Sequence, residues 1–310
     1  MSDPMSPNPP PIQSSSQVPS GDAPARVARA EALGEGLPPL LIAAERVAAT
    51  VAQGVHGRRR IGTGETFWQY RLHGPHDTAH AVDWRRSARS DDLFVRETEW
   101  EASQSVWMWS DRSPSMNYRS RKSRPTKSDR AALLLLATAA ALLRGGERIG
   151  LLGHDRRASG GRTGLKRLAE RYLTLGDHDA AFPASVDLPK HSQGVLFSDF
   201  LAPVEVWEKR FAEFSQQFVG GLAVQVLDPA EETLPFSGRA RFLGLEAEGE
   251  FMAERVETLR PDYRNRLAAH REALRHAARA AGWDLLVHRT DKSAEQALMA
   301  IYVALARQGG

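Results

Sequence analysis

Residues 106–144 carry the sequence VWMWSDRSPSMNYRSRKSRPTKSDRAALLLLATAAALLR. It begins with VWMWS, whose apolar and aromatic side chains are typical of a buried β-strand. A polar turn starts at Asp111, and the later apolar run predicts a helix over residues 130–144, with Ser128 as its N-cap and Gly145 as its C-cap. The stretch therefore predicts a strand, a polar loop and a helix, which is the repeating unit of an α/β sheet.

The same alternation continues towards the C-terminus. Further strands are predicted at residues 148–153, 194–200, 222–228 and 283–290. Further helices are predicted at residues 165–175, 204–218, 254–281 and 294–307. Because strands that alternate with crossover helices pair in parallel, we expect an α/β fold with a mostly parallel sheet and helices on both faces.

The sequence before residue 105 differs in composition. Residues 1–39 are rich in Pro and Ser and have few large apolar side chains, so they are predicted to be a disordered tail and linker. Residues 40–104 are predicted to contain a short amphipathic helix at 40–51 and then a β-rich segment interrupted by Gly, Pro and charged residues. Residues 105–310 are expected to form the α/β domain.

The composition excludes several classes of protein. The 310 residues include no Cys, which removes disulfides, thiolate metal sites and cysteine nucleophiles, and fits a reducing compartment. The 41 basic and 38 acidic side chains give a net charge of +3, so no nucleic-acid partner is expected. No apolar run is long enough for a membrane helix, and the N-terminus lacks the pattern of a secretory signal, so we expect a cytoplasmic protein without a transmembrane segment.

Polar side chains follow two of the predicted strands. Asp111, Ser113 and Ser115 place a carboxylate and two hydroxyls on the turn after the first strand, and Asp199 lies in the Ser198-Asp199 loop that follows GVLF at 194–197. Ligands of open α/β sheets bind outside the carboxyl ends of the strands, where these residues would meet if the two strands are neighbours. Carboxylate and hydroxyl oxygens suit a hard cation, so Mg²⁺ or another divalent cation is the expected ligand.

These motifs resemble a known family. The Asp-x-Ser-x-Ser pattern is similar to the metal-ion-dependent adhesion site (MIDAS) of von Willebrand factor A domains. More closely, the chain resembles the bacterial domain of unknown function 58 family from about residue 47 to the C-terminus. The motifs that carry this resemblance are GTGETF, AVDWRRSAR, LFVRETEWE, DRSPSM, FSDF and LDPAEETLPF.

The resemblance implies a von Willebrand A-like, Rossmann-like domain preceded by a β-rich segment, with no established catalytic activity. It also implies a MoxR-type AAA+ ATPase, or a client of that ATPase, as the partner. Von Willebrand A domains use a threonine as a further metal ligand. In this chain Thr163 and Thr174 are the nearby candidates, and neither is a secure match.

Two basic stretches allow a structural or a functional interpretation. In AVDWRRSAR we expect an internal ion-pair network with Asp83 and Trp84 packed, rather than a partner surface. The stretch after the Asp111 loop contains Arg121, Lys122 and Arg124, which would attract an acidic partner towards the metal.

Three functions remain open on the sequence. The first is a non-enzymatic, metal-dependent protein-binding module, in which a carboxylate of the partner completes the coordination of the metal. The second is a metal-dependent hydrolase in which Asp111 and Asp199 bind the metal and His154 or Asp155 acts as the base. The third is a structural scaffold that binds no metal.

Overall fold

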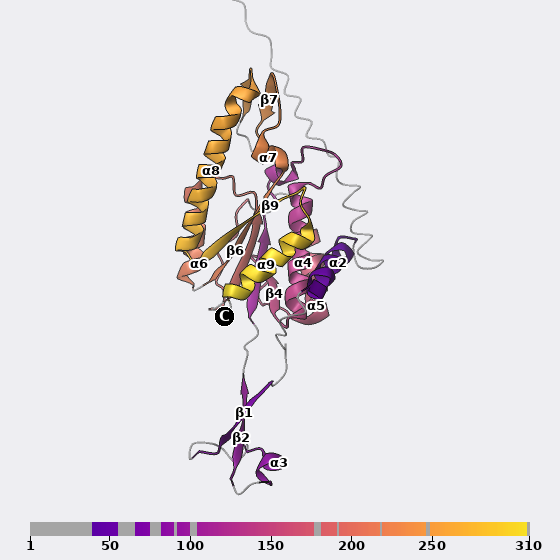
Figure 1. Ribbon diagram of the computed structural model, residues 1–310, viewed down its shortest axis with the longest axis vertical. Helices are drawn as coiled ribbons and strands as arrows, with labels where there is room; N and C mark the ends of the chain where they lie inside the picture. Colours follow the sequence, from indigo (N-terminus) through magenta and orange to yellow (C-terminus); the bar gives the residue numbers. More distant parts are fainter. Residues whose placement is uncertain are drawn as a thin grey trace, which may run out of the picture. The chain divides into compact units, whose positions relative to one another are not determined.

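The computed structural model describes residues 39–54, 66–74, 82–89, 92–99, 104–176, 181–190, 192–217, 219–245 and 249–308. These residues contain a five-stranded sheet in which all neighbouring strands are parallel. Figure 1 shows this sheet between its helices. Its strands, in spatial order, are β4 (Arg148–Leu151), β3 (Ser105–Ser110), β5 (Gln193–Ser198), β6 (Gly220–Leu227) and β9 (Trp283–Arg289). The predicted mixed α/β fold with a mostly parallel sheet is confirmed. Nearly all of the predicted N-terminal tail lies outside the described residues.

Helices cover both faces of this sheet. Alternate strand residues point to opposite faces, and in β3 Val106 and Met108 belong to one hydrophobic cluster while Trp107 and Trp109 belong to another. The first cluster includes buried residues of α2 (Pro39–Gly54), α4 (Lys127–Arg144), α5 (Gly161–Thr174) and α9 (Ala294–Gln308). The second includes buried residues of α6 (Val204–Gln216) and α8 (Val256–Ala280).

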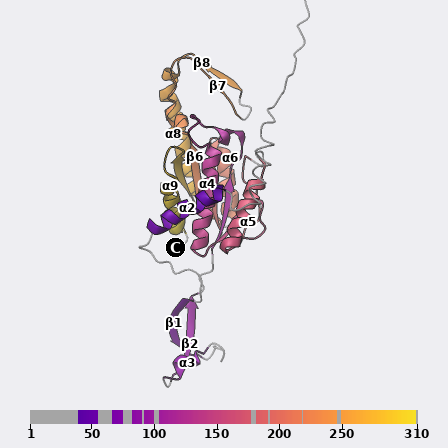
Figure 2. The same ribbon diagram turned by 90° about the vertical axis from the view of Figure 1, so that its right-hand side faces the viewer.

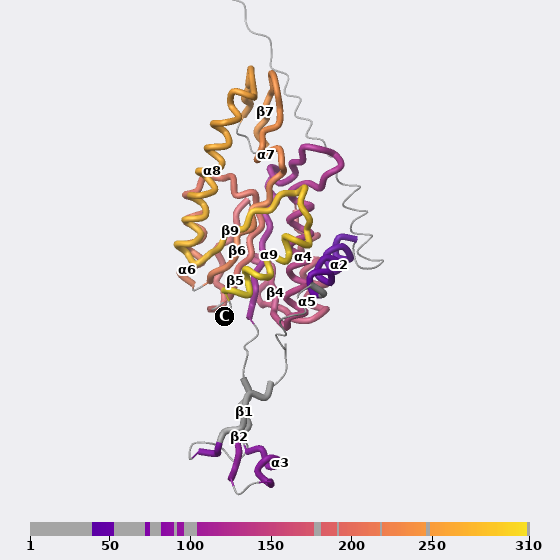
Figure 3. Tube along the Cα trace, in the orientation of Figure 1, coloured from indigo at the N-terminus to yellow at the C-terminus, as the bar shows by residue number. Residues whose placement is uncertain are grey.

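The first described helix, α2, belongs to the core of the α/β sheet. Its residues Leu41, Ala44, Ala48 and Val51 are buried in the same cluster as residues of α4 and α9. Figure 3 shows the indigo trace of α2 beside α4. The sequence alone grouped this helix with the β-rich segment that follows it.

Two small antiparallel sheets form no strand pairs with the main sheet. β1 (Thr66–Leu72) pairs with β2 (Phe94–Glu99), and the short helix α3 (Trp84–Ser87) lies between them in the sequence. Asp83 caps α3 by accepting from the backbone N–H of Arg86 at 3.0 Å, but Trp84 is 63% exposed, so its predicted packing is wrong. β7 (Ala240–Leu243) and β8 (Glu250–Ala253) form the other pair, seen beyond α8 in Figure 2.

The start of α4 differs from the prediction. Thr126, and not Ser128, is the N-cap: its hydroxyl accepts from the backbone N–H of Asp129 at 3.0 Å, and the Asp129 carboxylate accepts from the N–H of Thr126 at 3.2 Å. This reciprocal capping box satisfies two backbone donors at once, which explains why the helix begins earlier than the apolar pattern. As a result, Lys127 occupies the first position of the helix.

The strand order explains where a ligand can bind. The chain runs from β3 to β4 on one side of β3, and then crosses to β5 on the other side. Such a reversal leaves a crevice at the carboxyl ends of the two strands that flank it, here β3 and β5. The residues that follow these strands therefore belong to one site. Among the described helices, none is both long and apolar enough to cross a bilayer.

The carboxyl end of β9 is tied to the start of α4. Arg130 donates to the carbonyl oxygens of Thr290 at 3.0 Å and Lys292 at 2.8 Å, and its guanidinium lies 3.4 Å from the ring nitrogen of His288. Burial, together with this neighbouring cation, lowers the pKa of His288 from 6.5 to about 4. His288 is therefore neutral in the folded protein at physiological pH.

The close packing of β5 against β9 side chains predicts that Gly194→Ala destabilises the fold. A Cβ at residue 194 would lie 2.2 Å from the six-membered ring of Trp283, which is 1% exposed and has no room to move. We expect urea denaturation to show a loss of about 1–3 kcal/mol. Because the clashing ring atoms are absent from Phe, Trp283→Phe should lessen the effect of Gly194→Ala. Strict additivity of the two substitutions would contradict this explanation.

The pKa of His288 predicts a pH-dependent stability. The unfolded protein binds a proton at His288 near pH 6.5 and the folded protein only near pH 4, so stability is lost as the pH falls through this window. The full effect is about 3 kcal/mol. Comparing urea denaturation of the wild type and of His288→Gln at neutral pH and in this window isolates the contribution. Equal pH dependence of the two proteins would refute it.

Candidate functional site

The loop after β3 holds its carboxylate rigidly. Asp111 is 3% exposed, and its two carboxylate oxygens accept from the backbone N–H of Ser113 at 2.8 Å and from the hydroxyl of Ser198 at 2.6 Å. Its own N–H donates to the carbonyl oxygen of Phe197 at 2.7 Å, which extends the pairing of β3 with β5 by one residue. Pro114 then begins the short 3-10 helix η2 (Pro114–Asn117), which turns the chain away from the strand.

The loop after β5 meets the loop after β3. The hydroxyls of Ser113 and Ser115 lie 3.1 Å apart, and Ser115 donates to Asp199 Oδ2 at 2.9 Å. The other oxygen of Asp199 accepts from the N–H of Leu201 at 3.1 Å, and its backbone carbonyl accepts from Gln225 at 2.8 Å. The structure thus brings together Asp111, Ser113, Ser115 and Asp199, the four residues that the sequence proposed as metal ligands.

The sequence did not identify Lys127, which the structure places in the middle of this site. Its side chain is 1% exposed, and its ammonium lies 2.8 Å from Asp199 Oδ2 and 2.6 Å from Glu231 Oε1. Burial by itself lowers the pKa of Lys127, but the attraction of the two carboxylates and their hydrogen bonds outweighs burial and raises it. Lys127 is therefore a permanently charged cation that bridges two acidic side chains.

Negative charge at the site exceeds the charge of this lysine. Burial raises the pKa of Asp111 despite its hydrogen bonds from Ser198 and Ser113, and the charge of Asp199 raises it further. Burial also raises the pKa of Glu231, although Lys127 acts in the opposite direction. Both carboxylates are thus harder to ionise than in water, because burial disfavours their charged forms.

The LDPAEETLPF motif adds a third segment to the site, beside the loops after β3 and β5. Asp228 caps the short helix α7 (Pro229–Thr233) by accepting from Ala230 N at 2.8 Å, and its second oxygen accepts from Ser120 N at 3.1 Å. Glu231 completes this capping box, because its Oε2 accepts from Asp228 N at 2.7 Å while its Oε1 binds Lys127. Tyr263 of α8 donates to the carbonyl oxygen of Glu231, and burial with this acidic neighbour raises the pKa of Tyr263 to about 12.

The sequence analysis singled out neither Lys127 nor Glu231 as a site residue, although each lies within a capping-box pattern. Asp228 and Glu231 are three residues apart at the start of α7, and Thr126 and Asp129 have the same spacing around Lys127. These patterns locate the first turns of two helices beside the predicted loops. They do not show that Lys127 and Glu231 meet.

Of the three residues proposed to bind an acidic partner, Arg121 and Lys122 are exposed in the loop between η2 and α4. Arg124 is half-buried and donates to the hydroxyl of Ser120 at 3.2 Å, so it fastens this loop. Ser120 is the residue whose N–H binds Asp228. The loop is therefore anchored at the site while two of its basic side chains reach solvent.

The remaining candidates lie in the loop after the edge strand β4 and on α5. Thr163 is exposed in the first turn of α5, and the hydroxyl of Thr174 donates to the carbonyl oxygen of Arg171 in the same helix. Asp155, a proposed base, accepts from the N–H of Leu151 and pairs with Arg171 at 3.2 Å. His154 and Asp155 line a separate cleft after β4.

The site has the donor atoms of a hard-cation site, although not three acidic or imidazole ligands. No group of three or more His, Asp or Glu side chains within the described ranges is arranged to hold a metal ion. Two carboxylates and two hydroxyls converge instead, and all are oxygen ligands of the kind that Mg²⁺ accepts together with water. The residues present thus fit Mg²⁺, with Lys127 as a competing cation at Asp199.

One family model matches most of the chain. The family described as "Protein of unknown function DUF58" matches residues 69–273, more than half of the chain. The uncharacterized proteins Rv1480 of Mycobacterium tuberculosis and Mb1516 of Mycobacterium bovis are each 29% identical over 253 residues, covering 74% of this chain and 76% of theirs. The crystal structure of the conserved hypothetical protein BatB from Bacteroides thetaiotaomicron aligns with 66% of this chain and 100% of its own at 12% identity. Its TM-score of 0.30 is too low to support an argument.

The buried ion pairs predict that Lys127→Met destabilises the protein strongly, because it leaves two buried carboxylates without their cation. Urea denaturation should show a loss of about 3–5 kcal/mol. Lys166→Met is the matched control, since Lys166 is exposed on α5 and lies 3.7 Å from Glu170, where a surface pair contributes at most about 1 kcal/mol. Adding Glu231→Gln to Lys127→Met should restore part of the loss. Similar effects of the Lys127 and Lys166 substitutions would contradict the bridging role.

Proposed function

The chain belongs to the DUF58 family, and we propose that its α/β domain is a von Willebrand A-like, metal-dependent protein-binding module without catalytic activity. In this proposal Asp111, Ser113, Ser115 and Asp199 form a MIDAS-type site that holds Mg²⁺ or a similar divalent cation. The cation would supply an electrophilic centre at which a carboxylate of a partner protein can bind. The four side chains orient that centre and exclude competing ligands from its buried side.

One observation carries the proposal: the hydrogen-bonded series from Ser113 through Ser115 to Asp199 Oδ2, beside the buried carboxylate of Asp111. It joins two loops that are 84 residues apart in sequence at the point where the strand order reverses. A purely structural serine turn needs neither this convergence nor the burial of two carboxylates. The raised pKa of Asp111 adds support, because a cation would relieve the cost of keeping this group ionised.

The partner that we propose is a MoxR-type AAA+ ATPase or a client of that ATPase, in the cytoplasm. The exposed Arg121 and Lys122 support a basic surface for an acidic partner, because they follow the Asp111 loop directly and their loop is fastened to Asp228 through Ser120. Positive charge near the cation would steer an acidic partner towards it and increase the rate of association.

A metal-free scaffold is the second candidate, and Lys127 is the observation that favours it. The ammonium of Lys127 already neutralises Asp199 at 2.8 Å and is 1% exposed, so it can serve as the resident cation. The two candidates differ in one measurable respect. A scaffold keeps the same melting temperature with Mg²⁺ or with chelator, whereas a metal site is stabilised by the ion that it binds.

Isothermal titration calorimetry tests metal binding directly. We expect the wild type to bind Mg²⁺ and Asp111→Ala to bind it at least about tenfold more weakly, a difference of about 1.4 kcal/mol. Asp262→Ala is the control, because Asp262 is an exposed carboxylate on α8, and it should bind as the wild type does. If the wild type gives no heat with Mg²⁺ or Mn²⁺ and no change of melting temperature on chelation, the scaffold is supported instead.

A pull-down tests the partner separately. The wild type, Asp111→Ala and Asp262→Ala are each used to capture a MoxR-type ATPase co-expressed with the chain, with Mg²⁺ or with chelator. We expect capture by the wild type and by Asp262→Ala in Mg²⁺ alone. Equal capture by all three proteins would show that binding of the partner does not depend on the metal site.

A further inference from the structure

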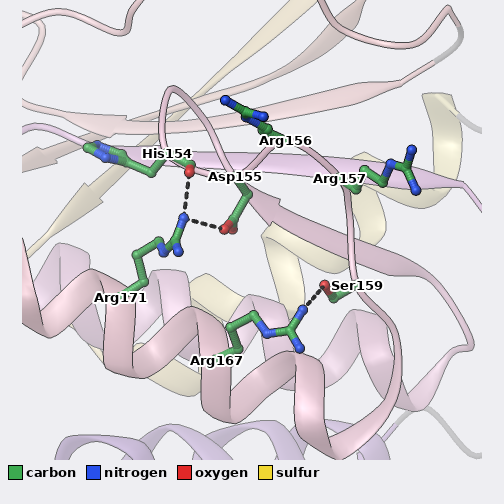
Figure 4. Close-up of a pocket in the computed structure, with 7 residues that line it drawn as sticks. All are labelled: His154, Asp155, Arg156, Arg157, Ser159, Arg167 and Arg171. Carbon is green, nitrogen blue, oxygen red and sulfur yellow. Dashed lines mark hydrogen bonds and ion pairs between the residues drawn. The ribbon is translucent and has the colours of Figure 1, made fainter.

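A cleft of about 670 Å³ lies between the loop after β4 and helix α5. Figure 4 shows the loop residues 154–159 arching over α5, with side chains of both elements around the space between them. The described lining residues are four arginines, one histidine, one serine and one aspartate. A cleft with this lining is strongly basic, and neither the metal-dependent binding module nor the metal-free scaffold uses it.

The loop is held in place at both ends. Near its start, the N–H groups of His154 and Asp155 donate to the carbonyl of Leu151 at 3.1 and 2.9 Å, and the carboxylate of Asp155 accepts from the N–H of Leu151 at 2.8 Å. Near its end, Arg148 donates twice to the carbonyl oxygen of Ala158, at 3.2 and 2.8 Å. The backbone of Ser159 also pairs with Ile149 on the edge strand β4. A wall fixed in this way needs little ordering when a ligand binds.

The opposite wall is the face of α5 that carries Arg167 and Arg171. Arg171 donates to the carbonyl oxygen of His154 at 2.6 Å and lies 3.2 Å from the carboxylate of Asp155. Arg167 donates to the hydroxyl of Ser159 at 3.4 Å. In Figure 4 both guanidinium groups rise from the helix towards the loop, so they are positioned by contacts with it.

Positive charge in the cleft is largely uncompensated. Asp155 is the one acidic side chain among the described lining residues, and its ion pair is with Arg171. Across the parts of the chain that the structure describes, no carboxylate lies within 4.0 Å of Arg156, Arg157 or Arg167. Figure 4 shows Arg156 and Arg157 on the loop with their guanidinium groups turned away from α5.

We propose that this cleft binds an acidic peptide segment of a partner protein, whose carboxylates pair with Arg156, Arg157 and Arg167. Guanidinium groups bind carboxylates through two parallel hydrogen bonds, and several arginines spread along a cleft suit several carboxylates along one chain. The volume exceeds what a single small anion fills. The described lining residues include no Phe, Tyr or Trp, which argues against nucleic acid, since its bases stack mainly on such side chains.

Fluorescence anisotropy with a labelled poly-glutamate peptide tests the site in the full chain, with chelator present so that the proposed metal site takes no part. We expect the wild type to bind the peptide, and Arg156→Gln combined with Arg167→Gln to bind it at least about tenfold more weakly. Binding should weaken as salt is added, because the contacts are ionic. A poly-glutamine peptide should not bind.

The matched control is Arg266→Gln combined with Arg279→Gln, which removes the same charge from exposed positions on α8. It should bind as the wild type does. An equal loss in the control variant would reduce the effect to overall charge and overturn the proposal, as would absence of binding by the wild type. Competition by inorganic phosphate that is stronger than competition by unlabelled peptide would assign the cleft to phosphoryl groups. Preference for a single-stranded RNA of equal charge would assign it to nucleic acid, and either of these results overturns the proposal.

Discussion

The buried ammonium of Lys127 holds together the carboxyl edge of the sheet. It joins the first turn of α4 to the loop after β5, through Asp199 at 2.8 Å, and to α7, through Glu231 at 2.6 Å. An ammonium taken out of water costs several kcal/mol unless it is well paired, so the three segments are stable only in this mutual arrangement. Ser115 donates to the same oxygen of Asp199, and this hydrogen bond also holds the loop after β3 in place.

The order of the strands puts these segments within reach of one another. β3 and β5 are neighbours although the chain visits β4 between them, so the loops that follow them open on opposite sides of one crevice. Backbone groups are satisfied there largely by side chains, as at Asp111, Asp228 and Thr126. Polar side chains that are already engaged in this way cannot rotate freely. The geometry of this edge of the sheet is therefore fixed by its own hydrogen bonds.

Regular elements were predictable because their signals are local. The strands of the main sheet and the helices between them follow from apolar runs with the period of a strand or of a helix, and the structure has them close to the expected bounds. Two differences between the prediction and the structure have physical reasons. α4 starts earlier than its apolar run because Thr126 and Asp129 form a capping box that outcompetes the cap predicted at Ser128. α2 was grouped with the segment that follows it, because an amphipathic pattern shows that a face is buried and not what covers it.

The sequence by itself determined the α/β class and the oxygen-bearing residues at the strand ends, because periodicity and turn chemistry act between near neighbours. Only the tertiary structure decided which cation meets them. The stretch from Arg119 to Arg130 offers several basic side chains, and Lys127 alone among them is fully buried. Its partners lie 72 and 104 residues away in the sequence. An ion pair between residues so far apart in the sequence depends on where the sheet places two distant loops. No local sequence pattern predicts that placement.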